Sequence, residues 1–87
     1  MLSKKIIIKN PTGLHVRPAG VLCNTAMNFK SSVTFSHDTT STNAKSLLSV
    51  LAARIKCGDE ITLICEGEDE QEAFETVASV IESGLGE

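Results

Sequence analysis

The change from a strand pattern to a helix pattern lies in residues 2–26, whose sequence is LSKKIIIKNPTGLHVRPAGVLCNTA. Leu2–Ile8 has β-branched residues at its centre and ends at Asn10-Pro11-Thr12-Gly13, which predicts a strand followed by a turn. Apolar residues then recur at helical spacing, and Pro18 suits a first turn because its missing N–H group is not needed there. We therefore predict a first helix that starts close to His15. The residues of its buried stripe are Ala19, Leu22, Cys23 and Ala26.

Three further strands are predicted from residues that alternate between apolar and polar character. Val33–Ser36 alternates in this way. The polar segment after it predicts a turn at His37-Asp38 and a short strand over Thr39–Thr42. Glu60–Cys65 forms the last predicted strand, which Glu66-Gly67 ends.

Two further helices are predicted from helical spacing of apolar residues. The second helix opens at Ser46, and Gly58 ends it after about ten residues. Its predicted buried face consists of Leu47, Leu48, Leu51, Ala52 and Ile55. The third helix has three acids between Asp69 and Glu72, where the helix dipole favours carboxylates, and it stops at Gly84. Its predicted stripe consists of Phe74, Val77, Ala78 and Ile81.

The predicted order of elements is βαββαβα. Helices grouped on one face of a mainly antiparallel four-stranded sheet would bury every apolar stripe in one layer. We therefore expect an α+β open-faced sandwich with three helices on one face of the sheet. Because 87 residues leave room for one core, we expect a single domain over residues 1–87.

Composition excludes several classes of protein. The chain is 41% hydrophobic and 22% charged, which is typical of a globular protein and not of a disordered one. No apolar run approaches the roughly 18 residues of a membrane span, and Met1–Asn10 is unlike a secretory signal, so we expect a cytoplasmic protein without membrane insertion. Three Phe, no Trp or Tyr and a net charge of −3 argue against nucleic-acid binding.

Charge is divided unevenly along the chain. All eight Lys and Arg lie in residues 1–57 with a single acid, whereas residues 58–87 carry the other ten acids and no base. The basic part could face acidic partners or phosphate, because local potential steers encounter. Simple solvation of the surface is the other interpretation, and from charge alone we favour it.

Few side chains could carry chemistry. Cys23, Cys57 and Cys65 form no Cys-x-x-Cys pair, so we expect reduced, partly buried thiols. The acidic segment Glu66–Glu75 lacks the spacing of a calcium loop and is expected to be a solvated helix start. His37 lies among Ser, Thr and Asp and is expected to be an exposed turn residue. We therefore predict no metal, no cofactor and no hydrolytic enzyme.

His15 differs from these residues because it lies immediately before a predicted helix. The unpaired N–H groups and the dipole of a first turn make an anion site beside the imidazole. The same field favours the neutral, nucleophilic form of His15. Arg17 can turn its guanidinium toward phosphate oxygens. Attack on a phosphoryl donor would give a phosphohistidine. Histidines at such positions also occur without any function.

The segment Gly13-Leu14-His15-Val16-Arg17-Pro18-Ala19 closely resembles the active-site motif of HPr, the histidine-containing phosphocarrier family of the bacterial phosphoenolpyruvate-dependent sugar phosphotransferase system. The resemblance covers the whole chain, and the βαββαβα sandwich is also the fold of this family. Further matching segments are Asn10-Pro11, Asn43-Ala44-Lys45-Ser46, Gly58-Asp59-Glu60-Ile61 and Gly67-Glu68-Asp69-Glu70.

The resemblance implies a phosphoryl carrier and not a turnover enzyme. By this resemblance, His15 takes the phosphoryl group on Nδ1 from phosphorylated Enzyme I and passes it to EIIA domains of sugar permeases, while Arg17 steadies the phosphate. The expected carrier is a monomer. Pre-aligned donors would matter more to it than acid–base catalysis.

The resemblance also implies a second site at Ser46. In the Gram-positive branch this serine is phosphorylated by HPr kinase/phosphorylase, and the modified carrier binds a transcriptional regulator of carbon catabolite control. Ser46 also occurs in members without that regulation. From its position we expect Ser46 to cap the second helix, and a phosphate there is electrostatically tolerated.

The family's docking face implies a set of contact residues around His15 and along the second helix. Apolar contact is expected from four leucines, although core packing is expected for at least two of them. These leucines are Leu14, Leu47, Leu48 and Leu51. Gly20, Asn24 and Met27 depart from the larger, polar or basic residues of many members. The implied docking residues are Leu14, Gly20, Lys45, Leu47, Leu48 and Leu51.

Two other functions compete with the sugar-type carrier. A nitrogen-related phosphotransfer paralogue would share His15 and Arg17 but use different partners. A regulatory binding module signalling through Ser46 alone is the other alternative, and the presence of His15 argues against it because that branch lacks the histidine.

Overall fold

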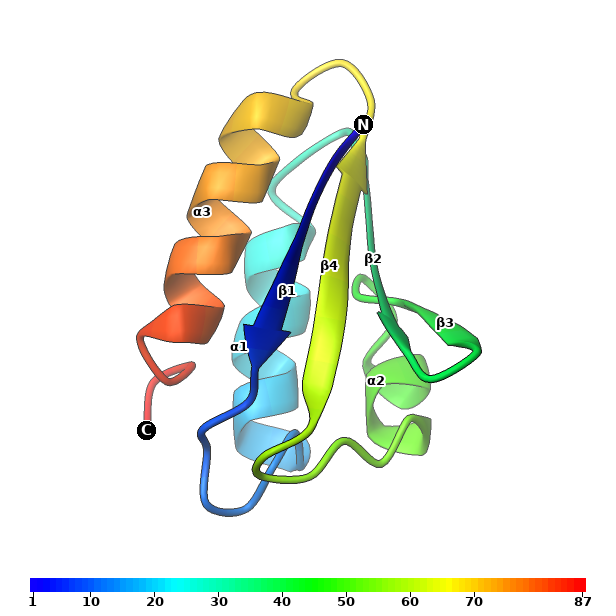
Figure 1. Ribbon diagram of the computed structural model, residues 1–87. Coiled ribbons are helices and arrows are strands. Elements are labelled where there is room, and N and C mark those ends of the chain that lie inside the picture. Colours follow the sequence, from blue (N-terminus) through cyan, green and yellow to red (C-terminus); the bar gives the residue numbers. More distant parts are fainter.

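The computed structural model describes residues 1–87 and has a four-stranded sheet covered on one face by three helices (Figure 1). The sheet order is β1-β4-β2-β3, and every neighbouring pair is antiparallel. The elements in chain order are β1 (Leu2–Ile7), α1 (Val16–Ala26), β2 (Ser32–His37), β3 (Thr40–Asn43), α2 (Leu47–Ala52), β4 (Glu60–Glu66) and α3 (Glu70–Glu82). The predicted open-faced sandwich with the order βαββαβα is therefore confirmed.

The core lies between the sheet and the helices because alternate strand residues point to the same face. On β4, Ile61, Leu63 and Cys65 are all fully buried. They pair in register with apolar residues of the neighbouring strands, including Ile6 opposite Ile61 and Phe35 opposite Leu63. Each such side chain contributes about 1.5–3 kcal/mol when it is removed from water.

The two long helices bury the stripes that their spacing predicts, with one difference. In α1 the whole predicted stripe is buried. In α3, Val77, Ala78 and Ile81 are buried as expected, but Ala73 is buried and Phe74 only half-buried. The two helices contact each other, and both contribute buried residues to the core that also contains the strands. None of the three helices has the length and apolar character that a membrane span requires.

The predicted length and buried face of the second helix are wrong. The helix α2 has six residues and ends well before Gly58, because Arg54 adopts a left-handed backbone with φ 53°. Val50 is fully buried, whereas Leu48 is 80% exposed. Residues two apart lie on nearly opposite sides of a helix, so burial of Val50 turns Leu48 outward. Ala52 is also exposed, and Ile55 is buried beyond the end of the helix.

The polar hairpin between β2 and β3 is displaced by one residue from its prediction. The turn lies at Asp38-Thr39, where Asp38 has φ 56°, and β3 follows from Thr40 to Asn43. His37 is therefore the last residue of β2 and not an exposed turn residue, and its side chain is only 28% exposed.

Candidate functional site

His15 is the N-cap residue of α1, at the end of the molecule where the β1–α1 connection meets the helix (Figure 1). Its backbone is extended, with φ −87° and ψ −165°, and its carbonyl accepts the bond from the N–H of Ala19 at 2.9 Å. The imidazole makes no capping hydrogen bond. The side chain is 52% exposed, so the ring is accessible to a partner.

The loop before His15 is fixed to the segment that follows α2. The N–H of Leu14 donates to the carbonyl of Ile55 at 3.0 Å. Gly13 has φ 68°, and a Cβ atom at this position would collide with the same carbonyl. Only glycine fits this left-handed, closely packed position. The backbone just before His15 is thus held in place by the segment that follows α2.

The first turn of α1 offers unpaired N–H groups beside His15. The N–H groups of Val16 and Arg17 donate to no protein acceptor, and Pro18 has no N–H group. The first turn contains no acidic residue. Free N–H groups and the positive end of the helix dipole favour an anion at this position.

Arg17 lies in the first turn of α1, two residues after His15. Its side chain belongs to an exposed residue and makes no hydrogen bond or ion pair within the chain. A guanidinium presents a fork of donors that matches phosphate oxygens. The sequence-predicted pair of His15 and Arg17 therefore shares one exposed turn.

A carboxylate that the sequence analysis missed also faces His15. The Oε2 atom of Glu87 lies 3.9 Å from His15 Nε2. Its other oxygen, Oε1, accepts a hydrogen bond from Asn10 Nδ2 at 2.9 Å. No local pattern indicates this group, because Glu87 and Asn10 are separated by 77 residues in the sequence.

Ser46 is the N-cap residue of α2, as the sequence predicts. Its Oγ atom accepts a hydrogen bond from the N–H of Ser49 at 3.3 Å, and its carbonyl accepts from the N–H of Val50 at 3.0 Å. Such caps typically contribute about 1 kcal/mol to stability. The residue is half-buried.

The structure divides the predicted docking residues into exposed and packed groups. Leu47 is 39% and Leu48 80% exposed. Leu14 is only 3% exposed and packs in the core, so it is one of the leucines for which core packing was expected, and it offers no side chain to a contact surface. Leu51 is half-buried against the same core. Val16, which the sequence analysis did not single out, is 65% exposed beside His15.

The two remaining docking candidates are both half-buried. Gly20 lies on α1, and a Cβ atom there would meet open space. The Nζ atom of Lys45 donates to the carbonyl of Phe29 at 2.6 Å, which ties its ammonium group to the segment after α1.

The other reactive side chains lie in different surroundings. His37 Nε2 is 3.5 Å from Asp59 Oδ2, and His37 Nδ1 is 3.9 Å from Asp38 Oδ2, so carboxylates face both ring nitrogens. All three cysteines are free, as expected, but Cys57 is exposed and not partly buried. Burial raises the pKa of the Cys65 thiol. No group of three or more ligand side chains could hold a metal ion.

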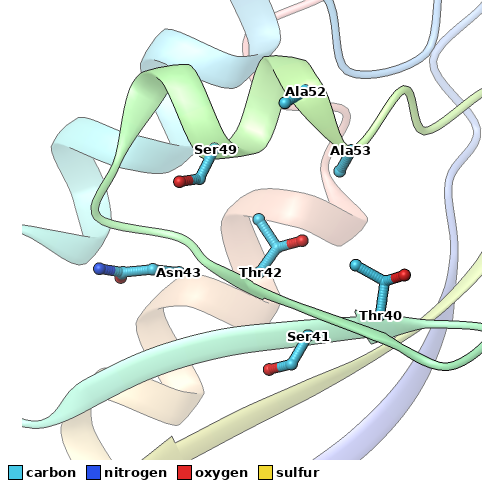
Figure 2. Close-up of a pocket in the computed structure, with 7 residues that line it drawn as sticks. All are labelled: Thr40, Ser41, Thr42, Asn43, Ser49, Ala52 and Ala53. Atoms are coloured by element: carbon cyan, nitrogen blue, oxygen red, sulfur yellow. The ribbon is translucent and has the colours of Figure 1, made fainter.

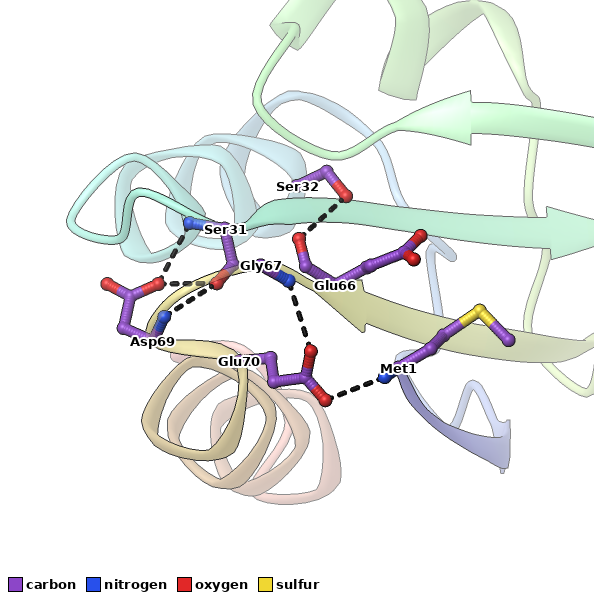
Figure 3. A network of polar contacts seen from close by, with 7 residues as sticks. All are labelled: Met1, Ser31, Ser32, Glu66, Gly67, Asp69 and Glu70. Atoms are coloured by element: carbon purple, nitrogen blue, oxygen red, sulfur yellow. Dashed lines mark hydrogen bonds and ion pairs between the residues drawn. The ribbon is translucent and has the colours of Figure 1, made fainter.

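At the start of α3, Asp69 and Glu70 bind groups of other segments (Figure 3). Asp69 accepts hydrogen bonds from the Ser31 hydroxyl at 2.5 Å, the Ser31 N–H at 2.8 Å and the Lys30 N–H at 3.0 Å. These bonds, the hydroxyl first, lower the pKa of Asp69 to about 2. Glu70 accepts from the Met1 amine at 2.7 Å and from the Gly67 N–H at 3.1 Å, and these bonds lower its pKa. Asp69 and Glu70 are thus bonded to the protein and not merely solvated.

A shallow pocket of about 250 Å³ lies between β3 and α2, away from His15 (Figure 2). No titratable side chain lines it, so it offers no base that could activate its hydroxyl groups. Its lining residues are Thr40, Ser41, Thr42, Asn43, Ser49, Ala52 and Ala53.

Comparison with known proteins gives consistent results. Residues 2–83 match the family described as "PTS HPr component phosphorylation site". The phosphocarrier protein HPr of Lysinibacillus sphaericus is 36% identical, with both chains covered completely. The HPr-like protein Crh of Bacillus subtilis, whose solution structure calls it the catabolite repression HPr, is 38% identical over 94% of this chain and 96% of its own.

The solved structures agree with the sequence comparison. A crystal structure of HPr from Thermoanaerobacter tengcongensis superposes with a TM-score of 0.95 at 39% identity, and covers 100% of this chain and 98% of its own. HPr of the same bacterium has also been crystallised as a dimer, which superposes with a TM-score of 0.79.

Proposed function

Because the chain belongs to the HPr family of phosphocarriers, we propose that His15 accepts a phosphoryl group from phosphorylated Enzyme I and passes it to EIIA domains of sugar permeases. The observation that carries this proposal is the half-exposed imidazole at the N-cap of α1, beside unpaired N–H groups. A carrier must be reached by two partners in turn, and an accessible ring at one end of the molecule meets this requirement.

The proposed transfer takes place at Nδ1 of His15. The lone pair of Nδ1 forms a bond to phosphorus, while the bond between phosphorus and the donor breaks and the donor retains that electron pair. The N–H groups of Val16 and Arg17 are free to bind the oxygens of the transferred group, since neither donates to a protein acceptor. The Arg17 guanidinium adds a charge that balances the phosphate. The chain acts here as a carrier, and the partners supply the catalysis.

The proposed docking surface for Enzyme I and EIIA domains consists of Val16, Leu47 and Leu48. All three are apolar and exposed, with Leu48 the most open at 80%. The helices α1 and α2 that carry them contact each other, which places the apolar residues and His15 on neighbouring elements. We further propose that residues 1–87 act as one domain, as a monomer in the cytoplasm.

The proposal is tested by incubating the protein with phosphoenolpyruvate and Enzyme I and measuring its mass. We expect one added phosphoryl group that is lost on mild acid treatment, as a phosphoramidate would be. A His37→Ala variant serves as the matched control, because it removes the other histidine and should still be labelled. An unlabelled wild-type protein, or a label stable to acid, would contradict the proposal.

A second function is favoured by the similarity to Crh. We propose that Ser46 is phosphorylated by HPr kinase/phosphorylase and that the product binds a transcriptional regulator of catabolite control. Ser46 caps α2 through its hydroxyl, and a phosphate at this position would still face the N–H groups of the first turn. Incubation with the kinase and ATP, with a Ser46→Ala variant as control, should give an acid-stable label. Absence of this label would leave Ser46 as a structural cap.

The nitrogen-related phosphotransfer branch remains the alternative for the partners. It would keep the chemistry at His15 and Arg17 and change only the donor and acceptor proteins. Transfer from sugar-type and nitrogen-type Enzyme I, compared at equal concentrations, distinguishes the two. Faster transfer from the nitrogen-type donor would overturn the sugar-type assignment.

A further inference from the structure

The chain after α3 curls back on itself and brings Glu87 to the site. Gly84, Leu85 and Gly86 have φ angles of 97°, 53° and 84°, all in the left-handed region. Leu85 is fully buried and its N–H donates to the carbonyl of Val80 at 3.0 Å. The buried leucine therefore anchors the tail, and Glu87 ends near the β1–α1 connection (Figure 1).

Asn10 holds the tail from the other side. Its side chain is part of a residue that is 97% buried, since only 3% of it is exposed. The Nδ2 atom donates to the carbonyl of Gly84 at 2.6 Å and to Glu87 Oε1 at 2.9 Å. Both amide hydrogens are thus used on the tail. One oxygen of the Glu87 carboxylate is fixed, which fixes the direction of the other.

The second oxygen of Glu87 faces one nitrogen of His15 and leaves the other free. Glu87 Oε2 lies 3.9 Å from Nε2, and the glutamate side chain is 21% exposed. No protein group is hydrogen-bonded to Nδ1 of His15. A carboxylate attracts the N–H form of the nearer nitrogen. The geometry therefore distinguishes the two ring nitrogens, unlike that of His37, where carboxylates face both.

We propose that Glu87, held by Asn10, is a positioning residue that keeps the proton of neutral His15 on Nε2 and so leaves the lone pair of Nδ1 for the phosphoryl group. When Nδ1 bonds to phosphorus and Nε2 keeps its proton, the ring gains a positive charge. The Glu87 carboxylate balances this charge. A protonated ring is also the better leaving group, so the same carboxylate assists onward transfer. This inference rests on the proposed function for the transfer step, but not for the position of the proton.

The position of the proton can be measured without any partner. The ¹⁵N chemical shifts of the ring of His15 report which nitrogen is protonated in the neutral form. We expect the Nε2–H form to predominate in the wild-type protein and the proportion of Nδ1–H to rise in Glu87→Gln. His37 in the same spectra serves as an internal reference that should not change. Equal ¹⁵N shifts in both proteins would overturn the proposal.

The effect on transfer is measured with phosphorylated Enzyme I. We expect Glu87→Gln to lower the maximal rate about tenfold, as expected for loss of one partly screened charge near 4 Å, with little change in the affinity for Enzyme I. Glu82→Gln is the matched control, because Glu82 is an exposed acid near the same end of α3 that pairs with Lys4. An unchanged rate in Glu87→Gln, or an equal loss in Glu82→Gln, would overturn the role of Glu87.

Asn10→Ala tests the link between the tail and the ring. It should lower the transfer rate less than Glu87→Gln, and the double variant should be no slower than Glu87→Gln alone, because both changes act through one carboxylate. Additive losses would contradict this link. If the wild-type protein accepts no phosphoryl group, the proposed function fails, while the ¹⁵N measurement still decides whether Glu87 sets the tautomer.

Discussion

The starts of α1 and α3 differ in what their side chains bind. At the start of α1, His15 makes no capping bond, no acid is present, and the N–H groups of Val16 and Arg17 have no protein acceptor. At the start of α3, the carboxylates of Asp69 and Glu70 accept hydrogen bonds from Ser31 and Gly67, outside the helix (Figure 3). The acids of α3 thus tie other segments to the helix and hold the fold together. The start of α1 is open, because its donors and its side chains remain available to a ligand.

The largest expected effect is on phosphoryl acceptance at the open start. His15→Ala should abolish labelling by Enzyme I and phosphoenolpyruvate, because no other side chain combines an exposed imidazole with free N–H groups. Its unfolding free energy should stay within about 0.5 kcal/mol of the wild type, as is usual for exposed positions. Mass spectrometry and urea unfolding measure the two quantities. Retained labelling would move the acceptor to another residue, with His37 tested next.

The start of α3 should show the reverse behaviour. Asp69→Ala removes the acceptor for Ser31 and Lys30, so it should lower the melting temperature by several degrees while phosphoryl acceptance by His15 persists. Glu68→Ala is the matched control, because Glu68 is an exposed neighbouring acid. Equal melting temperatures for the two variants would show that the bonds of Asp69 do not stabilise the fold.

The pH dependence of stability sharpens the same contrast. The folded pKa of Asp69 is about 2, below its ordinary value of 3.8. Its contribution is therefore fully present above about pH 4 and is lost as the pH falls through about 2. Thermal unfolding across this range should show the loss. In Ser31→Ala, which removes the main cause of the shift, the folded pKa lies closer to the ordinary value, so the loss should be smaller and should be complete at a higher pH. Identical profiles would contradict this assignment.

A smaller effect is expected when Arg17, the cation in the first turn of α1, is changed. Arg17→Lys keeps the charge but loses the fork of donors, so transfer from Enzyme I should slow roughly tenfold. Arg54→Lys is the matched control, because Arg54 is the other arginine and lies after α2. Rapid-quench measurement gives both rates. Wild-type rates for Arg17→Lys would mean that the N–H groups alone hold the phosphate.

The smallest expected effect concerns Ser46, at the start of α2. Ser46→Asp should keep α2 folded, because a carboxylate can also cap and suits the helix dipole. It should weaken Enzyme I binding several-fold, since the new charge lies beside the exposed Leu47 and Leu48. Calorimetry at two salt concentrations tests this, because screening should reduce the penalty. Ser3→Asp on β1 is the control. Unchanged affinity at low salt would refute the effect.

The elements with strong periodicity could be predicted because each carries its own pattern. The apolar stripe of α1 and the alternating apolar residues of β4 are local patterns. The side chains of both sets are buried as predicted. The buried face of α2 could not be predicted. Its leucines at positions 47, 48 and 51 fit a buried stripe, but the orientation depends on which side meets the core. Burial of Val50 decided that orientation.

The sequence by itself determined the position of His15 at a helix start. His15, the missing N–H of Pro18 and Arg17 are contiguous, so their relation depends only on local helix geometry. The bonds of Asp69 to Ser31 and of Asn10 to Glu87 join residues 38 and 77 positions apart. Only the tertiary structure decided these pairs. Such contacts arise when packed elements bring distant backbone segments together, and no pattern within either segment specifies its partner.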